Sequence, residues 1–229
     1  MDPGKIKIAF LTNKSDFGRK GHEVFINEGF DIVFSSFGEN HLFEKIKKHK
    51  FDYLVSFCYP YRVSKDILKL ADKTNINFHP APLPYYRGFA VYNFGIMNEE
   101  STWGTTAHIM EEKFDTGDIV FSNTFEICKE TETAFSLRQK SREKLFDLLK
   151  EFVNVLKKDI PVKKIKQTGQ SKYFSKKMLN ETRIIQEKDS HAVIDKKIRA
   201  FWCPPHPGAA ININGKEYII INNQIIKQR

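Results

Sequence analysis

Hydrophobic residues in the first part of the chain gather in short runs that alternate with amphipathic segments. Such runs are typical of strands buried on both faces, and they occupy residues 5–12, 30–37 and 51–57. Segments of helical character lie between and after them, at roughly 19–29, 39–49 and 64–72. The next predicted strand, 75–79, ends before Pro80, because proline donates no hydrogen bond to a ladder. This alternation predicts an α/β fold with a doubly wound, mostly parallel sheet.

The pattern changes after Gly104. Residues 105–110 and 117–127 alternate like strands and are separated by a short turn, which predicts an antiparallel pair at the edge of the sheet. Leucine and phenylalanine then recur at helical spacing through 131–158, so this stretch predicts a helix that covers the core. Pro161 blocks its continuation.

The last part of the chain predicts a small addition to this domain. Residues 191–202 are a short helix candidate, and 210–222 contain Asn214-Gly215, the strongest short hairpin signal. We therefore expect a main domain over residues 1–180 and a C-terminal appendage over 181–229, made of a helix and a β-hairpin.

Composition excludes several classes of protein. Of the 229 residues, 41% are hydrophobic and 28% charged, so the chain has the material for a real core. No apolar run approaches the ~20 residues of a membrane span, and the first residues lack a secretory segment. The cysteines, Cys58, Cys128 and Cys203, lie far apart, which argues against a disulfide framework or a cysteine zinc site. The histidines show no metal spacing, so we expect no bound metal. The separated cysteines and the short apolar runs lead us to expect a cytoplasmic protein that does not bind a membrane.

The net charge of +9 is compatible with a nucleic acid or a phosphorylated substrate as partner. The lysines are scattered, however, and their runs at 45–50 and 163–166 are typical of solvated faces. No RNA-binding motif accompanies them, so we expect no nucleic-acid partner. The first predicted βα turn, residues 12–18, has neither a G-x-G-x-x-G nor a Walker A loop, which disfavours nicotinamide and nucleoside-triphosphate enzymes. Lys14 in that turn is a candidate to meet a phosphate at the carboxyl end of the strand.

Three polar residues are candidates for acyl chemistry. Asn77 and His79 lie two apart on a predicted strand, so their side chains point to the same face near its carboxyl end. An amide donor stabilises an oxyanion, and an imidazole exchanges protons near neutral pH. Asp115 precedes the next strand in a turn in which Gly117 allows close backbone approach. Each signal alone is weak, and each also fits an ordinary turn.

Three segments together carry a family resemblance. They read NFHPAPLPYYRG at 77–88, GTTAH at 104–108 and DTGDI at 115–119. Their order and spacing resemble the formyltransferases that use 10-formyltetrahydrofolate, strongly over about residues 50–125 and more weakly in 171–178 and 198–209. The resemblance implies a Rossmann-like formyltransferase domain at 1–180, with Asn77, His79 and Asp115 as its catalytic residues.

Within that family, the chain most resembles the sugar-nucleotide N-formyltransferases. The shared features are the FHPAP loop, VYNF at 91–94 and Trp103-Gly104 before the histidine strand. Glycinamide-ribonucleotide formyltransferases use a glycine-rich phosphate loop that is absent here. Methionyl-tRNA formyltransferases, which would explain the positive charge, carry a C-terminal domain of about a hundred residues. That reading and a non-catalytic sugar-nucleotide or folate binding module remain alternatives.

The resemblance also implies ligands and their residues. The formyl donor is 10-formyltetrahydrofolate, and its candidate binding residues are Tyr61, Arg62, Val63, Glu111, Glu112, Lys113 and Phe114. The acceptor is a dTDP-linked amino-dideoxy sugar, most of all dTDP-4-amino-4,6-dideoxyglucose, destined for O-antigen or another surface polysaccharide. Its candidate binding residues are Lys14, Pro80, Ala81, Tyr86, Arg87, Tyr92 and Trp202. For the aromatic residues, plain packing is the competing explanation. We also expect a homodimer, because an apolar tail strand at 219–222 is suited to pairing across a two-fold axis.

Overall fold

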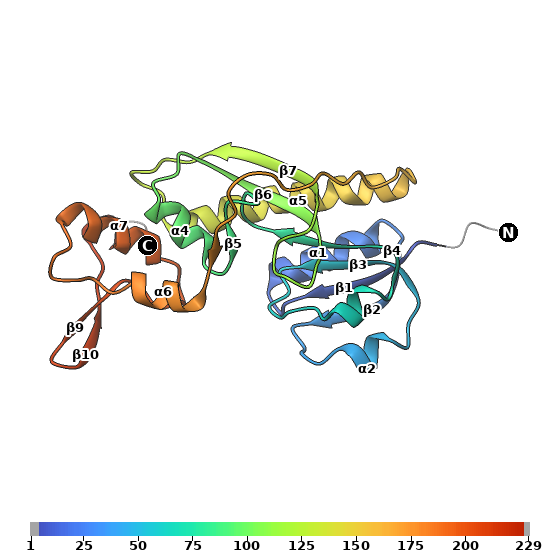
Figure 1. Cartoon of the computed structure of the whole chain (residues 1–229), viewed down its shortest axis with the longest axis horizontal. Coiled ribbons are helices and arrows are strands. Elements are labelled where there is room, and N and C mark those ends of the chain that lie inside the picture. Colours follow the sequence, from blue (N-terminus) through green and yellow to red (C-terminus); the bar gives the residue numbers. More distant parts are fainter. Residues whose placement is uncertain (1–4, 227–229) are drawn as a thin grey trace.

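The computed structural model of the protein describes residues 5–226 and contains one large mixed sheet (Figure 1). Its strands follow the order β2-β1-β3-β4-β6-β7. Their bounds are Lys7–Thr12 for β1, Asp31–Phe37 for β2, Phe51–Phe57 for β3, Ala71–His79 for β4, Thr102–Ile109 for β6 and Ile119–Glu126 for β7. β1 to β4 are parallel, while β6 runs antiparallel to both of its neighbours. The predicted fold class and the antiparallel pair at the sheet edge are confirmed.

Helices cover both faces of this sheet. The bounds are Asp16–Asn27 for α1, Phe43–Ile46 for α2, Lys65–Leu68 for α3, Val91–Met97 for α4, Ala134–Lys157 for α5, Lys176–Thr182 for α6, His191–Phe201 for α7 and Asn223–Ile226 for α8. In β1, Ile8 and Phe10 point to the side of α1 and α5, whereas Ala9 and Leu11 face α2 and α3. This two-sided burial is why the first strands are apolar at nearly every position.

Two helical predictions were too long. The segments 39–49 and 64–72 form the single turns α2 and α3, and β4 begins at Ala71 rather than at residue 75. The α2 turn buries one side chain, Ile46, and the lysines that follow it are exposed. The buried i, i+4 pair at each turn, Leu42 with Ile46 and Val63 with Ile67, is not continued by a further buried turn, so the helices do not extend. α4 and α6 were not predicted, because each has only seven residues.

The predicted core-covering helix, the tail helix and the hairpin are confirmed, whereas the predicted tail strand at 219–222 is not, because β10 ends at Ile219. α5 begins at a capping box formed by Thr133 and Ser136, and nine of its residues are buried. In the tail, β9 (Ala210–Ile213) pairs with β10 (Lys216–Ile219). Asn214 and Gly215 both have positive φ angles, 49° and 77°, as the two-residue hairpin turn requires. A second small sheet joins β5 (Arg87–Gly88) to β8 (Tyr173–Phe174).

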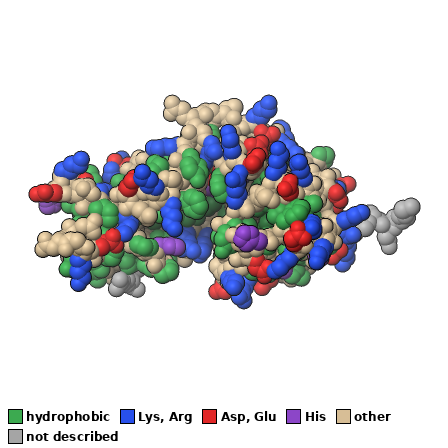
Figure 2. Space-filling view, turned by 60° about the horizontal axis from the view of Figure 1, so that its bottom comes forward, with side chains coloured by type: hydrophobic (Ala, Val, Ile, Leu, Met, Phe, Trp, Pro, Cys, Tyr) green, Lys and Arg blue, Asp and Glu red, His purple; other side chains and the backbone are tan. Residues whose placement is uncertain are grey.

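The tail has no core of its own. Its buried residues Ile198 and Phe201 on α7 belong to a second hydrophobic cluster, together with Phe94 on α4 and Trp103 on β6. α5 extends from the half of the molecule that contains α4 and the tail to the half that contains β1–β3 (Figure 1). On one face, a hollow lined by hydrophobic and basic side chains lies between these two halves (Figure 2). Among residues 5–226, no helix is long and apolar enough to cross a membrane, and no cluster of His, Cys, Asp and Glu could hold a metal ion.

The contact between α4 and β6 gives a test of this second cluster. A Cβ added at Gly95 would lie 2.4 Å from Cζ3 of Trp103, whose indole N–H donates to the carbonyl of Pro80 at 3.1 Å. We expect Gly95→Ala to lower the free energy of unfolding by about 1–2 kcal/mol, because overpacking outweighs the gain in helix propensity. Urea denaturation measures the change. Gln139→Ala, at an exposed helical site, serves as the control, and equal stability of both variants would contradict the tight contact.

Candidate active site

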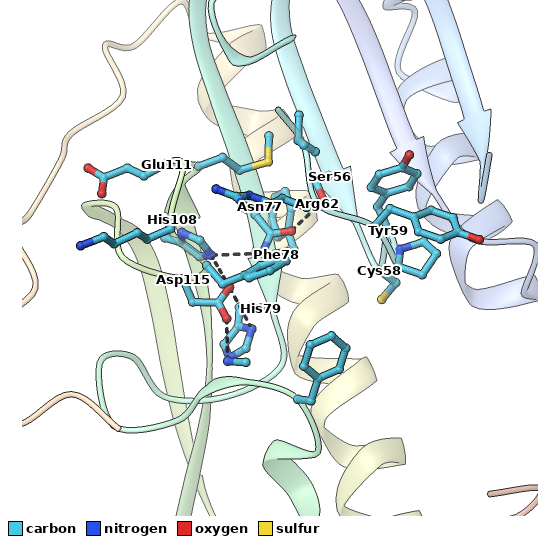
Figure 3. A pocket seen from close by; sticks show the side chains of 18 of the residues that line it. Ser56, Cys58, Tyr59, Arg62, Asn77, Phe78, His79, His108, Glu111 and Asp115 are labelled. Carbon is cyan, nitrogen blue, oxygen red and sulfur yellow. Dashed lines mark hydrogen bonds and ion pairs between the residues drawn. The ribbon is translucent and has the colours of Figure 1, made fainter. Parts of the chain in front are cut away.

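The candidate catalytic residues meet at the carboxyl end of β4. The sheet register aligns Ser56 on β3, Asn77 on β4 and His108 on β6 in one row across three strands. Ser56 Oγ donates to Asn77 Oδ1 at 2.7 Å, and Asn77 Nδ2 lies 3.1 Å from Nε2 of His108 (Figure 3). The row therefore holds the Asn77 amide from both sides.

The partners of His108 define the direction of this hydrogen bond. Its Nδ1 lies 2.8 Å from the carbonyl of Ile109, so Nδ1–H donates and Nε2 carries the lone pair. Nε2 then accepts one amide hydrogen of Asn77, while the amide oxygen accepts from Ser56. The second amide hydrogen of Asn77 is left for a ligand, because the residues 5–226 give it no acceptor. Asn77 is thus a pre-oriented donor that lines a cavity of about 210 Å³.

His79, at the end of the same strand, is held by a loop carbonyl. Its Nε2 lies 2.7 Å from the carbonyl of Tyr86, which is an acceptor only, so Nε2–H donates. Nδ1 faces Oδ1 of Asp115 at 3.6 Å. Burial lowers the pKa of His79 below its ordinary value of 6.5, and it outweighs the opposing effect of Asp115. The imidazole is therefore neutral at pH 7, with its lone pair toward the carboxylate.

Asp115 comes from the loop between β6 and β7 and is the third member of the group. Its Oδ1 also lies 3.5 Å from Nε2 of His108, and its Oδ2 accepts from the backbone N–H of Gly88 at 2.8 Å. Burial alone would raise the pKa of this carboxyl. The positive charge that His79 and His108 carry when they are protonated, together with the N–H of Gly88, holds this pKa well below its usual range. Asp115 is therefore a buried carboxylate at any physiological pH.

The loop around Asp115 is fixed in a strained conformation. Asp115 has a φ of 56°, in the left-handed region that aspartate tolerates better than most residues. Gln167 Nε2 donates to the carbonyls of Asp115 and Gly117, at 3.1 and 2.7 Å. A Cβ at Gly117 would lie 2.1 Å from the carbonyl oxygen of Ile109, so only glycine fits there. These contacts hold the backbone of the loop in place, so the carboxylate of Asp115 stays between the two imidazoles.

Two loops form the walls of the cavity. One carries Tyr61, Arg62 and Val63 and the other carries Glu111, Glu112, Lys113 and Phe114, and all seven residues expected to bind folate line the cavity. Nη2 of Arg62 donates to the carbonyl of Glu112 at 2.6 Å and lies 3.7 Å from its carboxylate, so it bridges the two walls. Asn77, His79, Asp115 and Pro80 line the same cavity.

The structure places other expected sugar-nucleotide residues outside the cavity. Ala81 is fully buried, and Tyr86 is stacked on Phe174 at 5.3 Å while its hydroxyl donates to Glu100 at 2.6 Å. Both side chains therefore contact protein rather than a cavity. Arg87 donates to the carbonyl of Phe114 at 2.9 and 3.1 Å, and so holds the Asp115 loop.

The three remaining candidates lie in two different places. Lys14 lies on a separate surface depression with Arg19 and His22. Tyr92 and Trp202 pack against the second hydrophobic cluster. Ser56 and Gln167 were missed by the sequence analysis. Ser56 could have been found from its place at the end of a buried strand, whereas nothing in the sequence around Gln167 indicates its contacts.

The arrangement suits transfer of an acyl group to a nucleophile. Asn77 offers an N–H donor to a developing oxyanion, and Nδ1 of His79 offers a lone pair. A proton that arrives at Nδ1 would lie between the imidazole and the Asp115 carboxylate, which would stabilise the resulting cation.

Comparisons with known proteins agree with this chemistry. The formyl transferase family model matches residues 12–153. The GDP-perosamine N-formyltransferase of Brucella melitensis is 32% identical over 215 residues, which cover 93% of this chain and 82% of that protein. A 4-N formyltransferase structure from Francisella tularensis has a TM-score of 0.79 at 19% identity, with 94% of this chain and 96% of that one covered.

A second solved structure shares the fold. The N-formyltransferase of Helicobacter canadensis, in complex with folinic acid and dTDP-3-aminofucose, has a TM-score of 0.75 at 20% identity. The likeness covers 93% of this chain and 86% of that one. The family model spans more than half of the chain, and the Brucella relative spans nearly all of it. The chain is therefore a formyltransferase that belongs to the formyl transferase family, on the branch of the sugar N-formyltransferases.

Proposed function

We propose that the enzyme transfers the formyl group of 10-formyltetrahydrofolate to the amino group of a nucleotide-linked amino-dideoxy sugar. The observation that carries this proposal is the cavity in which Asn77, His79 and Asp115 meet between two loops. Support for the ligands comes from relatives that are named for a nucleotide sugar or were solved with a folate and a dTDP-sugar. The cavity walls at 61–63 and 111–114 would hold the folate.

The foremost acceptor is dTDP-4-amino-4,6-dideoxyglucose, and GDP-linked amino sugars are its direct rivals because the Brucella relative is named for one. The product would serve O-antigen or another surface polysaccharide, made in the cytoplasm by a homodimer. Exposed apolar side chains on the tail, among them Ile219 and Ile221, support the dimer. Tyr92, Trp202, Lys14 and Pro80 remain proposed contacts of the sugar nucleotide.

In the proposed mechanism, the neutral sugar amine attacks the formyl carbon. Asn77 donates its second amide hydrogen to the oxygen as negative charge develops there. The amine gives one proton to Nδ1 of His79, and Asp115 stabilises the imidazolium. The bond from the formyl carbon to N10 of the folate then breaks, and N10 takes up the proton. The formyl group stays on the sugar and tetrahydrofolate leaves, so protons balance without a metal.

A turnover assay tests this function directly. We expect that incubation with 10-formyltetrahydrofolate and dTDP-4-amino-4,6-dideoxyglucose adds one formyl mass to the sugar and releases tetrahydrofolate. The 3-amino dTDP sugars and GDP-linked amino sugars form the rest of the panel, with mass spectrometry and folate absorbance as readouts. Formylation of methionyl-tRNA alone would contradict the sugar assignment. Binding of both ligands without turnover would identify a binding module instead.

Loss of the amide donor should reduce the rate rather than the affinity. We expect Asn77→Ala to lower kcat by ~10²–10³, because the oxyanion loses a pre-oriented hydrogen bond that forms fully in the transition state. Steady-state kinetics on the sugar that turns over measure kcat and KM separately. Asn40→Ala, which changes an exposed asparagine outside the cavity, should leave kcat and KM unchanged. A kcat of Asn77→Ala close to that of the wild type would remove this residue from the mechanism.

The buried neutral His79 makes stability depend on pH. In the unfolded chain its pKa returns to about 6.5, so below that pH the unfolded state binds a proton that the folded state does not. The free energy of unfolding therefore falls as the pH falls from about 7.5 to about 5.5, by up to about 1 kcal/mol per pH unit from this group. We expect His79→Gln to flatten that slope in urea denaturation. His206→Gln, at an exposed position, should keep the wild-type slope; identical slopes in both variants would contradict the burial effect.

A further inference from the structure

The middle of α5 lies between the two hydrophobic cores. From Leu145 onward, its buried residues belong to the core beneath the large sheet, whereas Ala134 and Leu137 belong to the core shared with α4 and α7. The stretch between contains Arg138 and Arg142, which are one turn apart and therefore on the same face of the helix. This face borders the buried stripe of the helix, which runs through Leu137, Ser141 and Leu145. Two half-buried arginines thus lie beside Leu137 and Ser141, the fully buried residues of this stretch.

Several segments converge on these arginines. Nη1 of Arg138 lies 3.7 Å from Sγ of Cys203 in the tail, and the guanidinium of Arg142 lies 5.1 Å from the ring centre of Phe17 on α1. Both arginines lower the pKa of Cys58 at the end of β3 and of Tyr92 on α4, so both residues lie within their electrostatic reach. The pair is half-buried, and along α5 it lies between the residues of the two hydrophobic cores.

The two positive charges have no counter-charge. In the described part of the chain, no carboxylate forms an ion pair with Arg138 or Arg142, and the acceptor that the structure gives them is the weakly accepting Sγ of Cys203. Burial raises the pKa of the Cys58 thiol to about 11 and also raises that of Tyr92, so both groups are neutral at pH 7. Burial, and next the proximity of Arg138, lower the pKa of Arg142, yet a guanidinium stays charged. Within residues 5–226 one acceptor, Sγ of Cys203, is given for the ten N–H donors of the pair, so most of these donors are available to a ligand.

We propose that Arg138 and Arg142 form an anion site for the diphosphate of the sugar nucleotide. This inference rests on the proposed function and adds a place for the nucleotide, which the catalytic cavity does not supply. Cys58 connects the two sites, because it lines the catalytic cavity (Figure 3) and also lies within the electrostatic reach of both arginines. Guanidinium groups one helical turn apart fit two linked phosphates, each able to take a bidentate pair of hydrogen bonds. The sugar would then extend from the diphosphate toward Asn77.

Calorimetric titration tests the site without turnover. The probes are dTDP, GDP, thymidine and folinic acid, titrated into the wild type, Arg138→Met, Arg142→Met and the double variant. We expect the wild type to bind at least one of the diphosphates and to bind thymidine at least ~10-fold more weakly than dTDP. Each single variant should weaken diphosphate binding ~10-fold and the double variant ~100-fold, because charge-assisted hydrogen bonds are lost. Folinic acid binding should not change, and Lys150→Met, an exposed charge loss on the same helix, should affect neither ligand.

Three results would overturn the proposal. They are unchanged diphosphate affinity in the double variant, a wild type that binds neither dTDP nor GDP, and a selective loss of folinic acid binding, which would make the arginines part of the folate site. If the double variant does not fold, phenylglyoxal modification of the wild type followed by peptide mass spectrometry replaces it. There, dTDP should protect Arg138 and Arg142 and thymidine should not; equal modification with and without dTDP would contradict the site. Failure of the turnover assay with intact diphosphate binding would refute the proposed reaction but not this site.

Discussion

The burial of one carboxylate organises the active site. An ionised carboxyl group taken out of water costs several kcal/mol unless its oxygens are compensated. Asp115 accepts the backbone N–H of Gly88 and faces two imidazoles, either of which compensates the negative charge when it takes up a proton. Each of these partners belongs to a different strand, so the carboxylate connects β4, β6 and β5. The same requirement explains Gln167 and Arg87, which contact no cavity atom of the group directly but hold the backbone of the Asp115 loop. Much of what surrounds the cavity is there to keep this charge in place.

The sequence could predict which residues meet but only part of why they meet. Strand alternation places Asn77 and His79 on one face, and the glycine after Asp115 indicates a tight turn. The row that fixes the Asn77 amide depends on register between strands, because Ser56 and His108 are its neighbours only through the pairing of β3, β4 and β6. Register is a long-range property: the position of Ser56 at the end of a buried strand can be read from the sequence, but its alignment with Asn77 cannot. The residues that bind the substrate were harder to predict. Tyr86, for example, is an aromatic residue suited to stacking on a base, but in the structure it is buried like a core residue.

The fold was predictable where one period dominates a long segment. The buried strands and α5 repeat their hydrophobic pattern over enough residues to identify each as a strand or a helix. The segments 39–49 and 64–72 fail this condition: they are rich in good helix formers but bury one or two side chains each, so packing supports only a single turn. The overall positive charge was also a poor guide to the site. Most lysines lie on solvated faces as expected, and the informative cations are two arginines hidden in an amphipathic helix, where their charge was indistinguishable from that of its polar face.

The tail matters to the site although it contributes no residue to the catalytic cavity. The backbone carbonyl of Trp202 accepts from the N–H of Phe135 at 2.8 Å, and Arg199 donates to the carbonyl of Glu132 at 3.0 Å, so α7 is fastened to the start of α5. Asn93 on α4 donates to the carbonyl of Ala200 at 2.7 Å and closes the same contact from the other side. These bonds fix α4 and the first turns of α5 against each other. The docked tail therefore forms part of the surroundings of the middle of α5, where Sγ of Cys203 lies 3.7 Å from Nη1 of Arg138.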